Sequence, residues 1–319
     1  MSGYVIKRLA QAVGVLWAAY TVSFLVLNWL PGDPVTAMAG AGMDSGDVDP
    51  ARLAALRHEY GFDKPVLVQY ADYLGRVVSG DFGDSVATGR PVTSTLADAL
   101  PQTLQLTSAA LLSAVLLGGG LAVLATYTAR RWLRQLLLSL PPLGVSVPTF
   151  WVGLLLVETF SFRLHWFPAF GNDGLKGLVL PALTLAVPTG AQVAQVLAKS
   201  LLTALDQAYV ETARAKGAGR WRVHLRHALR NASLPALTVV GLLVGQLIAG
   251  SVVVETVFSR DGLGRVTAAA VTAQDIPVVQ GVVAFGALIF VTTNLVIDLV
   301  YPLLDPRIVV ASGRRAALA

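Results

Sequence analysis

Long apolar stretches separated by polar segments dominate the pattern of hydrophobic and polar positions along this chain. A helix needs about 20 predominantly apolar residues to cross the hydrocarbon core of a bilayer. Six stretches reach that length: Leu9–Leu30, Leu104–Thr128, Leu136–Phe160, Leu178–Leu197, Leu234–Val254 and Val278–Ile297. All but one lack any charged residue, and the exception, Glu158, lies near the end of its stretch. The pattern predicts an all-α membrane protein with six transmembrane helices.

The third stretch differs from the others in its proline content. Pro141, Pro142 and Pro148 all lie within Leu136–Phe160. Proline removes a backbone donor and clashes with the preceding turn, so a helix bends or breaks at such a residue. We therefore expect a kinked or interrupted helix in this stretch.

The segment between the first two stretches, residues 31–100, carries helix signals of its own. Asp49 is a suitable N-cap, Pro50 suits a first helical turn and Gly61 suits a C-terminal stop. A second helix is expected to begin at Pro65, with turn residues following it at 79–85. Its expected apolar face consists of Leu67, Tyr70, Leu74 and Val78. Packing on the rim of the bundle and docking of an extracytoplasmic partner both remain open roles for this segment.

Four regions follow from this pattern. They are the N-terminus with the first span at 1–30, the extracytoplasmic helical segment at 31–100, a core with five spans at 101–310 and a tail at 311–319. The first stretch is expected to remain a span, although Ala37–Ala39 resembles a signal-peptide cleavage site. Leu9–Leu30 is longer than the apolar part of a signal peptide, which has about 7 to 15 residues.

Composition agrees with a membrane protein, and the distribution of charge predicts its orientation. Charged residues make up 13% of the chain, compared with about 25% in soluble domains. Segments rich in Lys and Arg stay in the cytoplasm, which here predicts that both termini are cytoplasmic. The inner segments then carry Lys7, Arg8, Arg130, Arg131, Arg134, Lys199, Arg214, Lys216, Arg220, Arg222, Arg226, Arg230, Arg307, Arg314 and Arg315, whereas the two short outer loops carry Arg163, Lys176, Arg260 and Arg265. The net charge of +5 is interpreted as this topological bias rather than as a nucleic-acid surface.

Several kinds of chemistry find no support in the sequence. The chain has no cysteine, and its four histidines lack the spacing of metal ligands, so we expect no metal site. No G-x-x-x-x-G-K-[ST] motif occurs, so the usual loop that cradles ATP phosphates is missing. No histidine lies in a predicted span, where it would be needed to activate a serine nucleophile. We expect no catalytic residue, and any ATP hydrolysis would belong to another polypeptide.

The cytoplasmic loop at 199–233 is the most informative segment. A compact helix around Tyr209–Lys216 is expected to end at Gly217, and a basic helix follows until Pro235 opens the next apolar stretch. Val210, Ala213 and Gly217 share one face of the first helix, where small residues permit close approach to a partner. In the second helix, Trp221, Leu225 and Ala228 or Leu229 share one face, and Arg222, Arg226 and Arg230 form a basic stripe on another. The stripe suits anionic lipid or an acidic partner, and a loop that serves topology alone remains an alternative.

Polar residues inside predicted spans are costly in lipid and therefore often functional. The candidates for a translocation pathway or gate are Gln192, Gln195, Gln246, Glu255 and Asn294. Gln192 and Gln195 are three apart and share a helical face, and amides can hydrogen-bond the backbone of a passing peptide. Glu255 lies at the outer end of its span, where an outer gate or a rim ion pair is expected. Hydrogen bonding between helices is the alternative role for all five.

The loop resembles the E-A-A…G signature of permease subunits in binding-protein-dependent ABC importers. Glu211, Ala213 and Gly217 match the signature, and Thr212 stands where the first alanine is usual. Pro235 lies farther beyond the glycine than in the common pattern, which is similar to the dipeptide and oligopeptide branch. Further matching motifs, in order, are Leu30–Pro34, Ser79–Ser85, Ser146–Leu154, Leu180–Leu185, Val252–Gly264 and Asp275–Gly281 through Leu303–Arg307. The resemblance covers nearly the whole chain.

This resemblance implies the first permease subunit of a di- or oligopeptide importer with a type I ABC importer fold in the bacterial inner membrane. The implied partners are a second homologous permease in a heterodimer, two ATPase subunits with ATP and Mg²⁺, and an extracytoplasmic substrate-binding protein. The implied coupling residues, which would dock on an ATPase subunit, are Val210, Glu211, Ala213, Arg214, Lys216 and Gly217. Nickel complexes, glutathione or a glycopeptide are alternative cargoes. A self-sufficient secondary transporter is the alternative class, although no internal repeat is evident.

Overall fold

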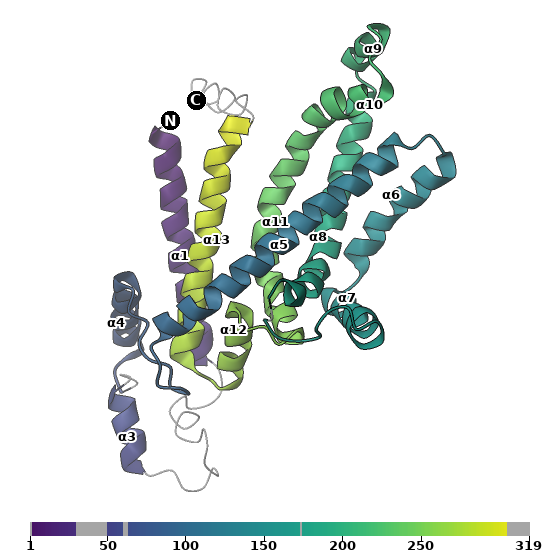
Figure 1. The fold of residues 1–319 in the computed structure, drawn as a ribbon. Coiled ribbons are helices and arrows are strands. Elements are labelled where there is room, and N and C mark those ends of the chain that lie inside the picture. The colour runs from purple at the N-terminus through teal and green to yellow at the C-terminus, as the bar shows by residue number, and fades with distance from the viewer. Residues whose placement is uncertain (1, 30–49, 60–62, 173, 305–319) are drawn as a thin grey trace. The chain divides into compact units, whose positions relative to one another are not determined.

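The described part of this computed structural model is built from helices and turns, and it contains no β-strand beyond a single isolated bridge (Figure 1). It comprises residues 2–29, 50–59, 63–172 and 174–304. The chain divides into two compact units, residues 1–102 with 261–292 and residues 103–260 with 293–319. The expectation of an all-α protein is confirmed for the described residues.

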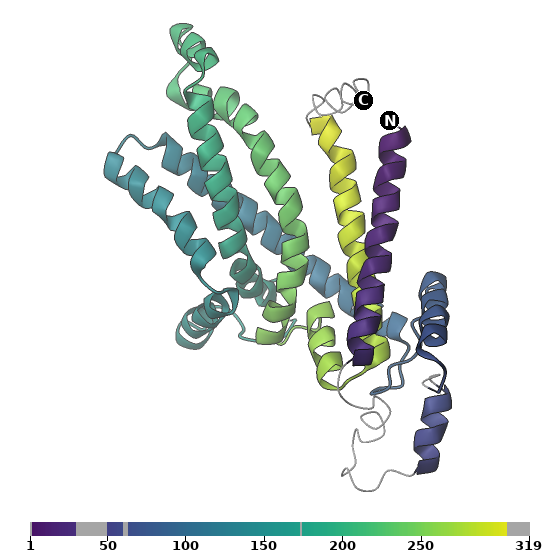
Figure 2. The ribbon, with the colours of Figure 1, turned by 180° about the vertical axis from the view of Figure 1, so that it is seen from behind.

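The first unit combines the N-terminal helices with a short helix from the last third of the chain. It contains α1 (Ser2–Trp29), α3 (Pro50–Glu59), α4 (Val66–Ser79), α12 (Leu263–Thr272) and the first parts of α5 (Val92–Tyr127) and α13 (Ile276–Leu304). In both ribbon views α1 runs beside α13 (Figures 1 and 2). The core of the unit joins α5, α12 and α13 through Val92, Leu96, Ala99, Leu263, Ala270, Val278 and Val279.

Helix α4 packs on α1 through an aromatic contact. The Tyr70 ring lies 5.3 Å from the ring of Phe24, edge-on, and its hydroxyl lies 2.7 Å from Thr21 Oγ1. The expected start of the helix after Pro65 is confirmed, but the expected apolar face is only partly correct. Leu67 and Val78 are each 82% exposed, because they do not lie on the side of α4 that carries Tyr70 and packs on α1. Helix α3 begins at Pro50 as expected, whereas Asp49 and Gly61 lie outside the described residues.

A buried carboxylate ties the turn after α4 to the start of α13. Asp275 is 3% exposed, and its Oδ2 accepts hydrogen bonds from Ser85 Oγ at 2.6 Å and from the Ala87 amide at 3.2 Å. Its Oδ1 lies 3.4 Å from the Val278 amide in the first turn of α13. Segments about 190 residues apart in the sequence are thereby held together.

In the second unit several helices pack around one long helix, α8 (Gly174–Leu205). The unit also contains α6 (Arg131–Ser146), α7 (Thr149–Leu156), η1 (Val157–Arg163), α9 (Ala208–Ala215), α10 (Arg220–Arg222), η2 (Val223–Ala228), α11 (Leu229–Val257) and the rest of α5 and α13. Helix α8 packs against α6, α7 and α11. Two apolar clusters flank it, one around Leu106, Leu185 and Phe258 and the other around Leu197, Leu201 and Ala232.

Four described helices are long and apolar enough to cross a membrane. They are α5, α8, the continuous helix Arg220–Val257 and Ile276–Thr293. A fifth span is formed if α6 and Thr149–Arg163 count as one, since they meet at an angle of 105°. The expected interruption of the third stretch is confirmed, and Pro148 lies at the break while Pro141 and Pro142 lie inside α6. Within α1 the apolar part that the structure describes is Ala10–Val26.

One expected boundary is wrong. Pro235 was predicted to open an apolar stretch, but it lies inside α11, which continues without a break to Val257. The helical turn before α11 is a π-helix, η2, whose i→i+5 pattern widens the backbone upstream of the proline. Basic helix and apolar span are therefore one continuous element.

Candidate coupling loop and transport pathway

Helix α9 is a short helix with well-defined ends. Glu211 lies in its first turn and Arg214 in its last, which suits the helix dipole at each end. Gly217 adopts the left-handed region at φ +82°. The Ala218 amide donates to the Ala213 carbonyl at 3.0 Å, and the Gly217 amide donates to the Arg214 carbonyl at 2.9 Å. This pair of bonds is a Schellman motif, so the expected helix stop at Gly217 is confirmed.

The orientation of α9 differs from the expected one. Val210 is completely buried, and α9 contacts η2 of the same chain. Ala213 is half-buried, whereas Glu211, Arg214, Lys216 and Gly217 are exposed. Val210 therefore anchors the helix and is not available to a partner, because an apolar side chain gains most by burial within its own chain. The outward side of α9 is its charged side.

The second helix of the loop also differs from the expected register. Val223, His224 and Ala228 form its buried side, and Trp221 remains 57% exposed. The π-helical pattern adds residues to the turn, which shifts the side chains that face inward relative to an α-helix. The basic stripe of Arg222, Arg226 and Arg230 is exposed throughout.

A cluster of polar and aromatic contacts fastens this second helix to the end of α5. The Arg220 guanidinium donates to the Tyr127 carbonyl and lies 4.6 Å from the centre of the Tyr127 ring. The rings of Trp221 and His224 both meet Tyr127 edge-on at 5.5 Å. His224 Nε2 lies 2.9 Å from Thr126 Oγ1. We call Thr126, Tyr127, Arg220, Trp221 and His224 the loop clasp.

The sequence reasoning missed the loop clasp. Its two halves are about 93 residues apart, and no spacing rule relates them. The only signal is the mixture of basic and aromatic residues at Arg220–His224, and no contact was inferred from it. Among the described residues no group of three or more His, Asp or Glu side chains could hold a metal ion, and His224 instead contacts Thr126.

The pathway candidates lie in three different helices. Gln192 is half-buried and Gln195 exposed on α8, and Gln246 is exposed on α11. Asn294 belongs to α13, and the structure describes its backbone alone. Each of the three glutamines thus keeps part of its surface exposed on this chain, as a pathway-lining residue requires.

Glu255 lies in a different environment from the other candidates. It is completely buried near the end of α11 and accepts a hydrogen bond from Thr103 Oγ1 at 2.7 Å. Arg260, which is 1% exposed, follows it and donates to the Gly177 carbonyl at 3.0 Å. The Glu255 carboxylate is therefore buried among the polar contacts that close the end of α11, and its role in an outer gate or a rim ion pair stays a prediction.

Sequence comparison places this helical chain among known transport proteins. Residues 1–107 match the N-terminal part, and residues 114–310 the main part, of the family described as binding-protein-dependent transport system inner membrane component. The chain belongs to this family of permeases. A Brucella suis biovar 1 (strain 1330) relative named as a peptide transport system permease is 37% identical, over 97% of this chain and 99% of that protein. The glutathione transport system permease protein GsiC of Salmonella typhimurium is 38% identical over the same shares.

The fold agrees with this assignment. The methionine ABC transporter MetNI, in an inward-facing conformation, matches this permease with a TM-score of 0.58 at 16% identity, covering 66% of this chain and 96% of that one. The crystal structure of an amino acid ABC transporter matches with a TM-score of 0.50 at 21% identity, over 67% and 94%. The chain is thus a permease subunit of an ABC importer, a multi-pass protein of the inner membrane.

Proposed function

We propose that this permease forms half of the translocation pathway of an ATP-driven importer of di- and oligopeptides. The relatives at 37–38% identity that carry the words peptide and glutathione in their names support a peptide cargo, since glutathione is itself a small peptide. A glutathione importer is the second candidate for the same machine. Both cargoes carry free charged ends and a peptide backbone.

In the proposed machine, α9 is the helix that couples this chain to an ATPase subunit. The observation that carries this proposal is the orientation of α9. Val210, on its apolar side, is buried within this chain. Its exposed side carries Glu211, Arg214 and Lys216, next to the exposed turn at Gly217. Charged groups in such an arrangement give a docked helix its orientation and its partner preference.

The proposed partners follow from the family. A second homologous permease completes the pathway in a heterodimer, two ATPase subunits bind and hydrolyse ATP with Mg²⁺, and an extracytoplasmic binding protein delivers the cargo. We further propose six spans, formed by α1, α5, the bent pair of α6 with α7 and η1, α8, α11 and α13, with both termini in the cytoplasm. The absence of a phosphate-binding loop from the sequence supports the division of labour with a separate ATPase.

Within the pathway we propose two different roles for the polar span residues. Gln192, Gln195, Gln246 and Asn294 would line the route and exchange hydrogen bonds with the peptide backbone. Glu255, being buried and bonded to Thr103, would act on gating by fixing the end of α11 rather than by touching cargo. Its substitution by glutamine should change uptake kinetics while the complex still assembles.

Co-purification tests the coupling proposal. The full chain is isolated in detergent, and the proteins that accompany it are identified by mass spectrometry for the wild type and for the Glu211→Ala/Gly217→Val variant. We expect an ATPase with a Walker motif and a second permease with the wild type, and loss of the ATPase alone with the variant. An ATPase retained at wild-type level by the variant would contradict the docking role of α9.

Uptake into proteoliposomes tests the cargo. Labelled dipeptide or glutathione is added to vesicles that contain the complex and its binding protein. ATP is either enclosed in the vesicle lumen, which corresponds to the cytoplasmic side, or left out. We expect ATP-dependent accumulation of the dipeptide that unlabelled peptide competes away. Accumulation driven by an ion gradient without ATP would instead indicate a secondary transporter.

A further inference from the structure

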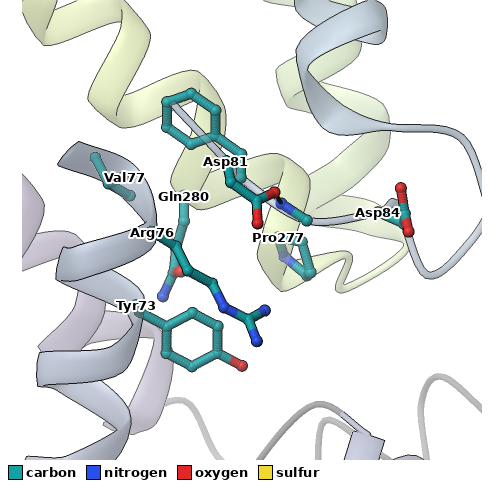
Figure 3. Close-up of a pocket in the computed structure, with 9 residues that line it drawn as sticks. Tyr73, Arg76, Val77, Asp81, Asp84, Pro277 and Gln280 are labelled. Atoms are coloured by element: carbon teal, nitrogen blue, oxygen red, sulfur yellow. Dashed lines mark hydrogen bonds between the residues drawn. The ribbon is translucent and has the colours of Figure 1, made fainter. Parts of the chain in front are cut away.

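A small cavity in the first unit has the lining of a ligand site. It has a volume of about 170 Å³ and lies between the last turns of α4, the turn that follows and the start of α13 (Figure 3). Its lining residues are Tyr73, Arg76, Val77, Asp81, Phe82, Gly83, Asp84, Pro277 and Gln280. The coupling and pathway residues discussed above take no part in it. We call it the α4–α13 cavity.

A buried amide faces the α4–α13 cavity. Gln280 is only 5% exposed, and no other described residue hydrogen-bonds its side chain. Its amide nitrogen and oxygen are not sealed from solvent, so they reach the cavity. They are available to hydrogen-bond a polar group that enters it.

The charges around the cavity are separated rather than paired. Arg76 reaches into it from α4 (Figure 3), and none of the ion pairs between described residues includes Arg76. Asp81 and Asp84 stand on the turn, where Asp81 Oδ1 accepts the Gly83 amide at 2.9 Å. A guanidinium, a neutral amide and two carboxylates thus line one small space. The complementary ligand carries a carboxylate, an ammonium group and a peptide-like group.

Both walls of the cavity are held in place by backbone geometry. Gly80 ends α4 in a left-handed turn at φ +77°, and Gly83 adopts φ +73°, conformations that favour glycine. The loop from Ser85 is fastened to the start of α13 through the buried carboxylate of Asp275. When a site is already formed before its ligand binds, less binding free energy is lost in ordering its residues. The affinity for a small ligand is correspondingly higher.

We propose that the α4–α13 cavity binds a zwitterionic dipeptide. The C-terminal carboxylate pairs with Arg76, the peptide group bonds the amide of Gln280, and the N-terminal ammonium approaches Asp81 and Asp84. Charge-assisted hydrogen bonds of this kind are shorter and stronger than neutral ones. The cavity admits a ligand with small side chains and excludes a folded segment of a partner. This inference rests on the proposed function, because it takes the cargo of the importer as the ligand.

Titration calorimetry on the complete complex, purified without its binding protein, tests the proposal. The probes are alanyl-alanine, its C-terminal amide and its N-acetyl form. The variants are Arg76→Gln, Gln280→Leu and Asp84→Asn, and Arg90→Gln is the matched control, since Arg90 pairs with Asp98 outside the cavity. We expect Arg76→Gln and C-terminal amidation each to weaken binding about tenfold or more, a factor usual for one charged contact. The two losses should not add, because both remove the same ion pair.

Several results would overturn the proposal. They are the absence of saturable dipeptide binding, equal binding by wild type and Arg76→Gln, or additive losses for the variant and the amide. A change in capture of the binding protein by Arg76→Gln without any change in dipeptide binding would make the cavity a protein contact instead. Unfolding midpoints of all variants show whether each is folded, and Arg76 is exposed enough for its substitution to be tolerated. Failure of the proposed function appears separately, as proteoliposomes that take up a different cargo, because the titration involves no transport.

Discussion

At Gly118 and Gly190 the lack of a side chain decides how closely α5 and α8 approach each other. A Cβ atom on Gly118 would lie 2.2 Å from the Gly190 carbonyl oxygen, and one on Gly190 would lie 3.0 Å from the Ala114 carbonyl oxygen. Backbone atoms cannot move aside as flexible side chains can. Small residues of this kind are the usual means by which helices in a membrane come into close contact.

Replacing Gly118 by alanine should therefore destabilise the chain. We expect Gly118→Ala to lower the free energy of unfolding by about 1–3 kcal/mol, the usual penalty of overpacking. Gly120→Ala on the same helix is the control, since nothing lies within 4 Å of its added Cβ and alanine favours a helix by about 1 kcal/mol. Thermal unfolding in detergent measures both variants. Equal midpoints for the two would show that the close contact does not limit the packing of α5.

Gly217 matters for its backbone conformation rather than for space. Nothing lies within 4 Å of a Cβ added there, but its φ of +82° is unfavourable for a side chain by about 1–2 kcal/mol. Gly217→Val should disturb the Schellman turn and reduce ATPase binding, whereas Gly219→Val should not, because Gly219 is extended at φ −64°. Co-purification of the ATPase measures the difference. Equal loss with both variants would mean that bulk in the loop, and not the turn, is what matters.

At the scale of elements, the loop clasp connects the coupling loop to a membrane-crossing helix. Tyr127 ends α5, and it meets Arg220, Trp221 and His224 of the second loop helix. A force applied to the loop by an ATPase would reach α5 through these contacts as well as through α8 and α11, which continue the loop at each end. The clasp thus gives the proposed coupling loop a third attachment.

The Tyr127 ring can be tested apart from the rest of the clasp. Tyr127→Ala removes the cation–π contact and two edge-on ring contacts, which together contribute about 1–2 kcal/mol. We expect peptide transport per ATP hydrolysed to fall several-fold while the ATPase remains bound. Tyr127→Phe keeps the ring and the backbone carbonyl, and it should behave like the wild type. Normal transport by Tyr127→Ala would limit the clasp to a purely structural role.

Element positions were predictable from the sequence to different degrees. The proline pattern predicted the broken helix because Pro148 acts locally, and the stop at Gly217 was predictable for the same reason. The inward side of the loop helices was not predictable, because Val210 is buried by residues after the loop turn and η2 departs from the 3.6-residue period. An amphipathic pattern identifies a helix, but it does not tell which partner covers each side.

At the scale of the whole molecule, contacts between distant segments are what the sequence could not predict. Asp275 was part of a recognised motif, yet its bonds to Ser85 and Ala87 join motifs about 190 residues apart. The position of Glu255 near a span end predicted an outer gate or a rim ion pair, but it did not predict the burial of its carboxylate beside Thr103. Hydropathy predicts the existence of spans, whereas burial of a single polar residue depends on the packing of several of them.

Site-specific crosslinking tests the central claim, that the charged side of α9 docks on an ATPase. The chain contains no cysteine, so single-cysteine variants can be made without removing native residues. Glu211→Cys and Arg214→Cys on α9 are compared with Lys64→Cys, an exposed residue of the segment proposed to lie outside the membrane. The account predicts crosslinks to the ATPase from both α9 positions, with yields that change when ATP binds, and none from Lys64→Cys. No ATPase crosslink from α9, in a complex that still imports peptide, would contradict it.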